Sequence, residues 1–400
     1  MNTQILTKHK KYIYPAFGLL LLGAVGIFAI SVLLPTVYEV NTEEELAAVE
    51  ALEKEVPIPK EPPVTHLNTP EFVRALYMTS CIAGTPSLRK RLVSIAEETE
   101  VNAFVIDIKD YSGNIAFSTK DPRFKDAEGL TCTVGDMREF ISVLHKKDIY
   151  VIGRVTVFQD PHFAKKHPDI AVKKESDKTT WKDYKGISFI DAGAREYWDY
   201  IVELSRESYN IGFDELNFDY IRFPSDGNMR DIYYPVSEEV VLADPDFGKA
   251  RVVKDFFAYL HNGLKDTGAV LSADMFGMVA TNSDDLNIGQ TIEFAEPYFD
   301  YIAPMVYPSH YPKGFNGYQK VNAYPYEIVK FSMDQAVKKL YAASSTPEKL
   351  RPWLQDFDYP IQYTPEMVLA QIQAVYDAGL DSWMLWDPTN QYTREILLPE

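Results

Sequence analysis

Short runs rich in β-branched and aromatic residues alternate with amphipathic helical stretches along nearly the whole of residues 71–390. This alternation is typical of parallel strands joined by crossover helices, and eight such runs indicate a closed barrel. The chain from Glu71 onward, roughly 330 residues, suits one barrel of about 250 residues plus insertions. We therefore predict an α/β fold, a (β/α)8 TIM barrel. The predicted strands are Phe72–Thr79, Ala103–Lys109, Tyr150–Val157, Glu215–Ile221, Val270–Met275, Tyr301–Val306, Arg351–Gln355 and Ser382–Trp386.

Two of the intervening helices carry their own boundary signals. Thr85-Pro86 precedes one apolar stripe, and Thr364-Pro365 precedes another that stops at Gly379. A threonine cap followed by proline favours a helix start, and glycine favours a helix end. An open, doubly wound sheet is the alternative fold, but it usually has fewer strands.

The N-terminal part of the chain predicts a membrane anchor. Residues 12–34 carry no charge and are long enough, as a helix, to cross a hydrocarbon core of roughly 30 Å. Lysines precede this run and glutamates follow it, so the positive-inside rule places residues 1–11 in the cytoplasm. We predict a transmembrane signal-anchor, with a cleaved signal peptide as the alternative.

Residues 35–69 mix prolines with acidic residues and show little apolar periodicity, which predicts a semi-rigid extracytoplasmic linker. The barrel then occupies residues 70–400. The expected location is the cell membrane, with a single pass and the catalytic domain outside the cytoplasm.

Charge and cysteine content limit the partners. The formal net charge is -18 and the pI is about 4.9, which argues against nucleic acid or an anionic membrane surface as the ligand. The sequence has no CxxC, HExxH, P-loop or GxGxxG motif, so we predict neither a metal nor a cofactor. The two cysteines, Cys81 and Cys132, either form a disulfide or remain as two buried thiols.

The segment Gly212–Pro224 predicts an active-site strand. Side chains alternate along a strand, so Glu215, Asn217 and Asp219 share one face. A polar face within a buried strand costs free energy, and a carboxylate at the C-terminal end of a barrel strand is typically catalytic.

Asp219 and Asp274 are the predicted catalytic pair. They stand at the ends of neighbouring predicted strands, whose backbones run about 4.8 Å apart. Glycosidic cleavage needs one protonated and one ionised carboxyl group, and Arg154 or Arg222 would keep one of them ionised. The structural alternatives are a salt bridge from Asp219 to Arg222 and a capping or loop hydrogen bond for Asp274.

Other polar and aromatic residues collect at the predicted strand ends, where the loops of a barrel meet. Asp107 and Lys109 share strand parity, so an internal ion pair between them is one expectation. Trp386 either stacks on a sugar ring or fills the barrel. The predicted substrate-binding residues are Asp107, Lys109, Arg154, Asn217, Arg222, Tyr307, His310, Gln355, Asp356 and Trp386.

Several motifs, in order along the chain, resemble the "putative glycosyl hydrolase domain" family of bacterial proteins. The resemblance covers nearly all of residues 72–390 and implies a glycosidase-like TIM barrel, without assigning a nucleophile. The matching segments are 105–110 with Gly113, 153–155, 158–161, 212–224, 272–277, 288–290, 304–311 and 351–357.

Three functions are compatible with these residues. The favoured one is a membrane-anchored glycoside hydrolase that cleaves surface or cell-wall polysaccharide by two-carboxylate acid/base chemistry. The second is a non-catalytic glycan-binding protein on a degenerate barrel. The third is a cation-dependent enzyme that uses Asp107, Asp219 and Asp274 as oxygen ligands.

Overall fold

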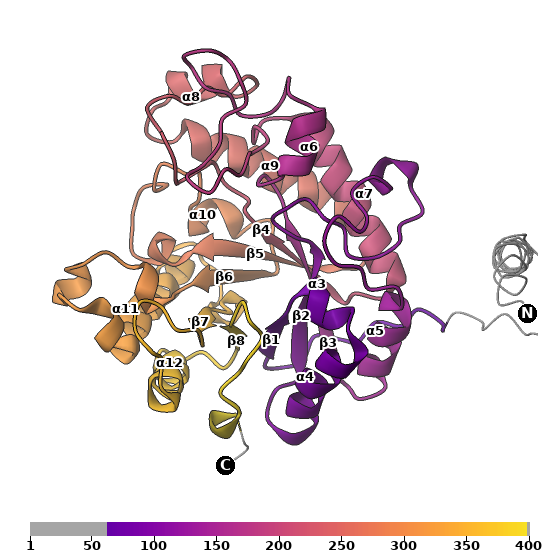
Figure 1. Cartoon of the computed structure of the whole chain (residues 1–400). Coiled ribbons are helices and arrows are strands. Elements are labelled where there is room, and N and C mark those ends of the chain that lie inside the picture. Colours follow the sequence, from indigo (N-terminus) through magenta and orange to yellow (C-terminus); the bar gives the residue numbers. More distant parts are fainter. Residues whose placement is uncertain (1–61, 398–400) are drawn as a thin grey trace, which may run out of the picture. The chain divides into compact units, whose positions relative to one another are not determined.

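Eight parallel strands close into a barrel in which each strand pairs with the next along the chain and β8 pairs with β1 (Figure 1). The computed structural model describes residues 62–397. All eight predicted strands are present, with ends that differ by a few residues. The strands are β1 Arg74–Met78, β2 Ala103–Lys109, β3 Tyr150–Thr156, β4 Glu215–Asp219, β5 Val270–Phe276, β6 Tyr301–Met305, β7 Trp353–Gln355 and β8 Trp383–Trp386.

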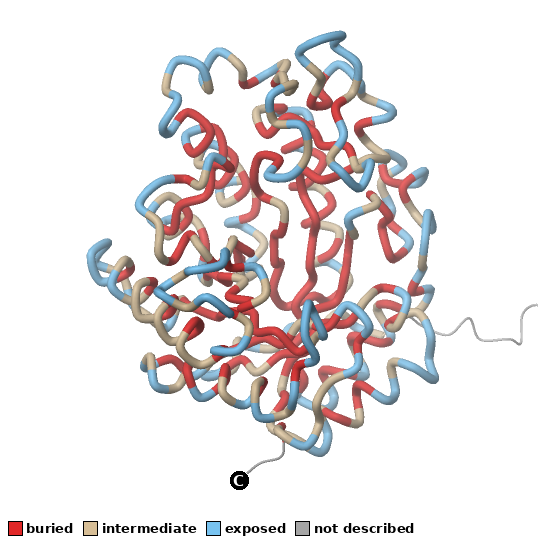
Figure 2. The backbone as a smooth tube through the Cα atoms, turned by 60° about the vertical axis from the view of Figure 1, so that its left-hand side comes forward, coloured by how far each residue is buried: buried red, intermediate tan, exposed pale blue. Residues whose placement is uncertain are grey.

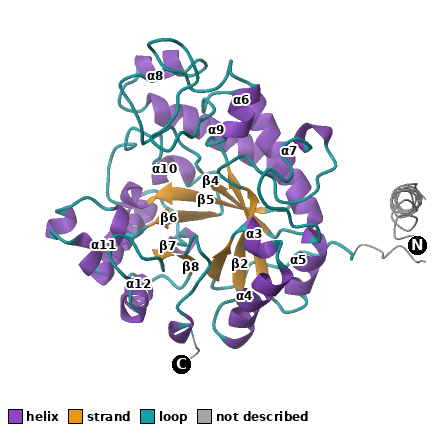
Figure 3. Cartoon of the chain, in the orientation of Figure 1, coloured by secondary structure: helices purple, strands orange, loops and turns teal. Residues whose placement is uncertain are grey.

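Helices form the outer layer around the strands (Figure 3). Pro86 begins one of them and Pro365 begins another, as predicted, and Gly379 follows the second with a φ of 78°. The helices are α3 Ser80–Ala83, α4 Pro86–Glu98, α5 Met137–His145, α6 Pro161–Lys166, α7 Arg195–Ile211, α8 Glu238–Ala243, α9 Gly248–Leu264, α10 Ile292–Ala295, α11 Pro325–Ala342 and α12 Pro365–Asp377.

Figure 2 shows that the strands are largely buried. Helices cover the outside of the barrel, and side chains fill its inside. A large apolar cluster lies between strands and helices. A smaller one, which includes Ala75, Val105 and Ile152, comes from alternate strand positions. This inner apolar packing precedes the polar residues along each of these strands, so the polar residues gather at the carboxyl end of the barrel.

A bulge in β2 separates two residues that were expected to face the same way. Asp107 pairs in register with Arg154, but Lys109 pairs with the next residue, Val155. The skipped residue reverses the alternation, so Lys109 follows the outward facing of Val155. The predicted Asp107–Lys109 ion pair is therefore wrong: Lys109 Nζ lies 2.9 Å from Asp160 Oδ2 instead.

The folded part of the chain begins before residue 70. The backbone N–H of Leu67 donates to Asp214 Oδ1 at 2.7 Å, and Arg138 Nε donates to the carbonyl of Pro62 at 2.9 Å. Residues 62–69, expected in the linker, thus contact the barrel. Within residues 62–397 no helix is both long and apolar enough to span a membrane. The predicted anchor at 12–34 lies outside the described residues.

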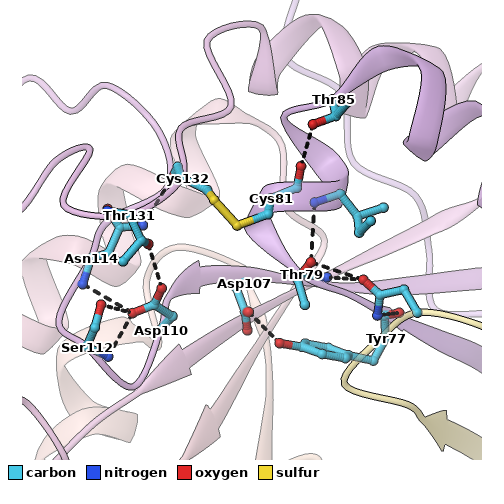
Figure 4. The surroundings of a disulfide bond; sticks show 12 residues. Tyr77, Thr79, Cys81, Thr85, Asp107, Asp110, Ser112, Asn114, Thr131 and Cys132 are labelled. Atoms are coloured by element: carbon cyan, nitrogen blue, oxygen red, sulfur yellow. Dashed lines mark hydrogen bonds between the residues drawn. A yellow bond between two sulfur atoms is a disulfide. The ribbon is translucent and has the colours of Figure 1, made fainter.

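Cys81 and Cys132 form a disulfide, which resolves the two alternatives left by the sequence (Figure 4). Their Cα atoms are 4.9 Å apart. The disulfide joins α3 to the segment after β2, where Asn114 Nδ2 donates to the carbonyl of Cys132 at 3.0 Å and Thr131 Oγ1 donates to Asp110 Oδ2 at 3.1 Å. The loop that follows β2 is therefore held both covalently and by hydrogen bonds.

Replacing both cysteines with serine should lower the free energy of unfolding. The bond closes a loop with a sequence separation of 51, for which chain entropy predicts a loss of about 4 kcal/mol. Chemical denaturation of the oxidised wild type and of the double variant measures the difference. Reductant should destabilise only the wild type. Equal midpoints for the two oxidised proteins would contradict the expectation.

Candidate active site

Arg154 lies at the centre of a carboxylate cluster near the carboxyl end of the barrel. It projects from β3, and its Nη1 donates to Asp107 Oδ1 on β2 at 2.7 Å. Its Nη2 donates to Asp219 Oδ2 on β4 at 2.5 Å, and its Nε lies 3.9 Å from Asp274 Oδ2 on β5. All four side chains are buried. Burial alone would lower the pKa of Arg154, but the carboxylates of Asp219 and Asp107 raise it well above its usual value.

Asp274 is a buried carboxyl group with a strongly raised pKa. Its Oδ1 accepts hydrogen bonds from Asn217 Nδ2 at 2.9 Å and from Trp353 Nε1 at 2.7 Å. Burial, followed by the negative charge of Asp219, raises the pKa of Asp274 to about 8. Asp274 is therefore largely protonated at neutral pH, which suits a general acid.

Asp219 is surrounded by donors. Arg154 donates to Oδ2 through both Nη2 and Nε, and the backbone N–H of Tyr220 donates to Oδ1 at 2.6 Å. These contacts stabilise a negative charge on Asp219. The alternative salt bridge to Arg222 does not form among the described contacts, because Arg154 occupies that role. Tyr220 has a φ of 53°, an unfavourable conformation for a bulky residue, and such strain tends to occur at functional sites.

A cavity of about 580 Å³ opens onto both carboxyl groups. Its wall combines the charged cluster with aromatic faces. Seven of the predicted site residues line it: Arg154, Asp219, Arg222, Asp274, Tyr307, His310 and Trp386.

Trp386 takes part in the wall and in the barrel packing at once. Its ring stacks on Tyr77 with centroids 3.9 Å apart, and the guanidinium of Arg154 lies 5.0 Å from its centroid.

Burial, followed by the charges of Asp274 and Asp219, raises the pKa of Tyr307 well above its usual value. This tyrosine therefore presents a neutral hydroxyl to the carboxyl pair.

His310 lines the same cavity farther out. Burial and the positive charge of Lys185 lower its pKa. Its Nδ1 lies 2.9 Å from Ser309 Oγ, so a neutral imidazole is available to hydrogen-bond a ligand.

Two further predicted site residues support the cluster from behind rather than lining the cavity. Asp107 accepts a hydrogen bond from Tyr77 at 2.6 Å as well as from Arg154. Burial raises its pKa, and Arg154 opposes that effect. Asn217 donates to Asp274 and to Ser272 Oγ at 3.1 Å. Both residues position groups that face the cavity.

The remaining three predicted residues do not line the cavity. Lys109 is fully buried and donates to the carbonyl of Thr156 at 2.7 Å, beside Asp160. Gln355 Nε2 donates to the carbonyl of Phe357 at 2.9 Å, within the loop after β7. Asp356 accepts from Thr393 Oγ1 at 2.6 Å, and burial raises its pKa to about 7. These contacts fix loops around the site.

Several residues of the site were not predicted. Trp353 shares strand parity with Gln355, a signal that would have placed it inside the barrel beside the carboxyl pair. Phe276, two positions after Asp274, likewise lines the cavity. Asp183 and Lys185 come from the long segment between β3 and α7, where no regular pattern indicates which side chains turn inward.

The guanidinium of Arg154 lies where the cation-dependent hypothesis would place a metal ion. Arg154 already binds Asp107 and Asp219 and stands beside Asp274. Within residues 62–397 no group of three or more His, Cys, Asp or Glu side chains is arranged to hold a metal ion. The carboxylates proposed as cation ligands are thus arranged around a guanidinium.

The closed barrel of eight parallel strands with helices outside is the TIM-barrel architecture. A family model described as "Putative glycosyl hydrolase domain" matches residues 75–392, and the chain therefore belongs to that family, as its motifs predicted. No curated protein matches the sequence.

Two solved structures share the barrel, and a third aligns with half of the chain. The glycoside hydrolase domain of PgaB (BpsB) from Bordetella bronchiseptica aligns with 82% of this chain and 99% of its own, at a TM-score of 0.59 and 13% identity. A chitobiase from Flavobacterium johnsoniae aligns with 79% of this chain and 45% of its own, at 0.51 and 14%. A hypothetical protein from Ruminiclostridium thermocellum ATCC 27405 is 31% identical over 50% of this chain and 96% of its own, at 0.43.

Asp274→Asn should stabilise the protein increasingly as pH rises. The pKa of Asp274 is about 8 in the folded protein, above its usual value of 3.8. The protonated group therefore contributes its full stabilisation below pH 3.8, and this stabilisation is lost as the pH rises through about 8. Asparagine stays neutral throughout. Melting temperatures measured from pH 4 to 9 should therefore show a variant-minus-wild-type difference that grows with pH. A difference independent of pH would contradict the raised pKa.

Proposed function

We propose that this protein is a glycoside hydrolase in which Asp274 is the general acid and Asp219 is the nucleophile or the base that activates water. The observation that carries this assignment is the unequal environment of the two carboxyl groups in one cavity. Burial and a neighbouring negative charge keep a proton on Asp274, whereas Arg154 and a backbone N–H stabilise a carboxylate at Asp219. Glycosidic cleavage requires this division of roles.

In the proposed reaction the proton of Asp274 passes to the leaving glycosidic oxygen as the bond to the anomeric carbon breaks. Asp219 then forms a bond to that carbon or removes a proton from the attacking water. In the first case water afterwards breaks the bond between Asp219 and the sugar, and the ionised Asp274 takes the proton of that water. Arg154 Nε lies 3.2 Å from Asp219 Oδ2 and 3.9 Å from Asp274 Oδ2. The two carboxyl groups are therefore close enough to each other to act on one glycosidic bond. Positive charge accumulates on the sugar in the transition state, where the carboxylate of Asp219 stabilises it.

The walls of the cavity support a sugar as the ligand. Trp386, Tyr307 and Phe276 provide flat apolar surfaces, while neighbouring polar groups offer hydrogen bonds to hydroxyls. Two proteins with the same barrel are described as a glycoside hydrolase domain and as a chitobiase, which favours the same class of reaction here.

We further propose that the enzyme is anchored in the cell membrane by residues 12–34 and acts on surface or cell-wall polysaccharide. The uncharged N-terminal run supports this location. The disulfide between Cys81 and Cys132 is consistent with it, because disulfides persist mainly in oxidising compartments outside the cytosol.

Release of new reducing ends from a panel of cell-wall and storage polysaccharides tests the activity. Asp219→Asn should lower turnover by about 10³-fold or more on every substrate, because it removes the charge that the transition state needs. Asp274→Asn should lower turnover by roughly 10²–10⁴-fold on natural substrates, and much less on aryl glycosides whose leaving groups need no proton.

Asp169→Asn is the matched control, since this exposed carboxylate does not line the cavity. It should leave turnover within a few fold. Glycan binding without any release by the wild type would instead favour the non-catalytic, glycan-binding alternative.

Turnover should fall on the alkaline side of its pH profile with an apparent pKa near 8, where Asp274 loses its proton. Trp353→Phe keeps an aromatic ring but removes the N–H that donates to Asp274 and lowers its pKa. The alkaline limb of the variant should therefore move to higher pH. Profiles of kcat for the two proteins measure the shift, and an unmoved or lowered limb would refute the assignment of the proton to Asp274.

A further inference from the structure

Arg222 is the second arginine of the cavity, and its surroundings differ from those of Arg154. It lies three residues after Asp219, beyond the left-handed turn at Tyr220, and its side chain is only 7% exposed while lining the cavity. The guanidinium packs over the ring of Tyr220 at 4.8 Å from the centroid and over that of Phe276 at 4.5 Å.

The hydrogen-bonding capacity of Arg222 is largely unused. A guanidinium has five N–H donors, but within residues 62–397 the only hydrogen bond found for Arg222 runs from Nη1 to the carbonyl of the adjacent Phe223, at 3.0 Å. It forms no salt bridge with any described carboxylate, whereas Arg154 forms three. Burial lowers the pKa of Arg222, and the charges of Tyr220, Asp219, Asp183 and Asp226 oppose that effect without forming a salt bridge. A buried cation without a salt-bridge partner is costly and is expected where a ligand supplies the missing contact.

We infer that Arg222 binds the carboxylate of an acidic sugar unit next to the cleaved bond, so that the substrate is an acidic polysaccharide. This inference rests on the proposed function, because it names the substrate class of the same cavity. The two aromatic rings cover the guanidinium and leave its N–H edge for the ligand. That edge matches the two oxygens of a carboxylate in one plane, which is the geometry that distinguishes arginine from lysine.

The other charged groups of the wall do not complete the site of Arg222. Asp219 is engaged by Arg154. Asp183 Oδ1 accepts the backbone N–H groups of Lys185 and Ile187 and thereby shapes its own loop. Asp226 is exposed, and Lys185 adds an exposed positive charge to the same wall. The buried guanidinium is thus the group most able to select a ligand charge.

Binding to matched polysaccharides tests the inference. The full chain carrying Asp274→Asn, which slows turnover, is titrated with polygalacturonate, alginate and hyaluronan, and with the carboxyl-reduced form of each. Reduction converts the carboxylate to a neutral alcohol and keeps the backbone and linkage. At least one acidic polymer should bind roughly 10- to 100-fold more tightly than its reduced form, as expected for a charge-assisted hydrogen bond.

Variants separate Arg222 from general electrostatics. Arg222→Met should abolish the preference while leaving the affinity for the reduced polymer unchanged, and Arg222→Lys should retain part of it. Lys185→Met, the matched change at an exposed cation, should preserve most of the preference. Near-ultraviolet circular dichroism shows whether Arg222→Met folds. If it does not, the inference is tested by whether Arg222→Lys loses more of the preference than Lys185→Met.

Three results would overturn the inference: equal binding of acidic and reduced polymers, no binding of any acidic polymer, or an undiminished preference in the Arg222 variants. Release of reducing ends by the otherwise wild-type chain is measured in parallel. A charge preference without release would refute the hydrolase and leave the role of Arg222 intact. Release of reducing ends without a charge preference would refute the role of Arg222 and leave the hydrolase intact.

Discussion

The ion cluster around Arg154 is the constraint on which the rest of the site depends. Two carboxylates, Asp107 and Asp219, already exceed the single positive charge of the guanidinium. Burial and the negative charge of Asp219 raise the pKa of Asp274, and the nearby Arg154 only partly offsets them, so Asp274 keeps its proton. Arg154 thereby holds the carboxylate of Asp219 beside the protonated Asp274. It also links β2, β3, β4 and β5 across the barrel, which couples the charge arrangement to closure of the sheet.

Parallel strand register explains why these groups meet. Asp107, Arg154 and Asn217 are successive partners across β2, β3 and β4, and Ser272 continues the row on β5. Asp219 and Asp274 follow two positions later on their own strands and so face the same interior one layer higher. The inner apolar cluster fills the barrel with side chains from earlier strand positions. The carboxyl groups around Arg154 therefore lie in the layers that border the cavity, whereas the ion pair between Glu215 and Arg351 is buried deeper, beside the inner apolar cluster.

Much of this could be predicted from the sequence, because alternation and strand order depend on local patterns. These patterns predicted the eight strands and the common face of Glu215, Asn217 and Asp219, from which we inferred that Asp219 and Asp274 would be neighbours. The partners of individual charges were harder. A bulge in β2 turned Lys109 away from Asp107, and the salt bridge to Asp219, for which Arg222 was the structural alternative, is formed by Arg154. The disulfide depended on a spatial proximity that two isolated cysteines do not encode.

The two arginines of the cavity have different surroundings. Arg154 binds the carboxylates of Asp107 and Asp219 and serves the acid/base pair, whereas Arg222 keeps N–H groups that no acceptor among residues 62–397 binds. The formal net charge of -18 opposes an acidic ligand at long range, but that repulsion is screened beyond about 10 Å in 0.1 M salt. Inside the cavity the buried guanidinium is much less screened. Association of an acidic polymer should thus become faster with added salt, while the contribution of Arg222 to the preference for that polymer, which is set at contact, should change little.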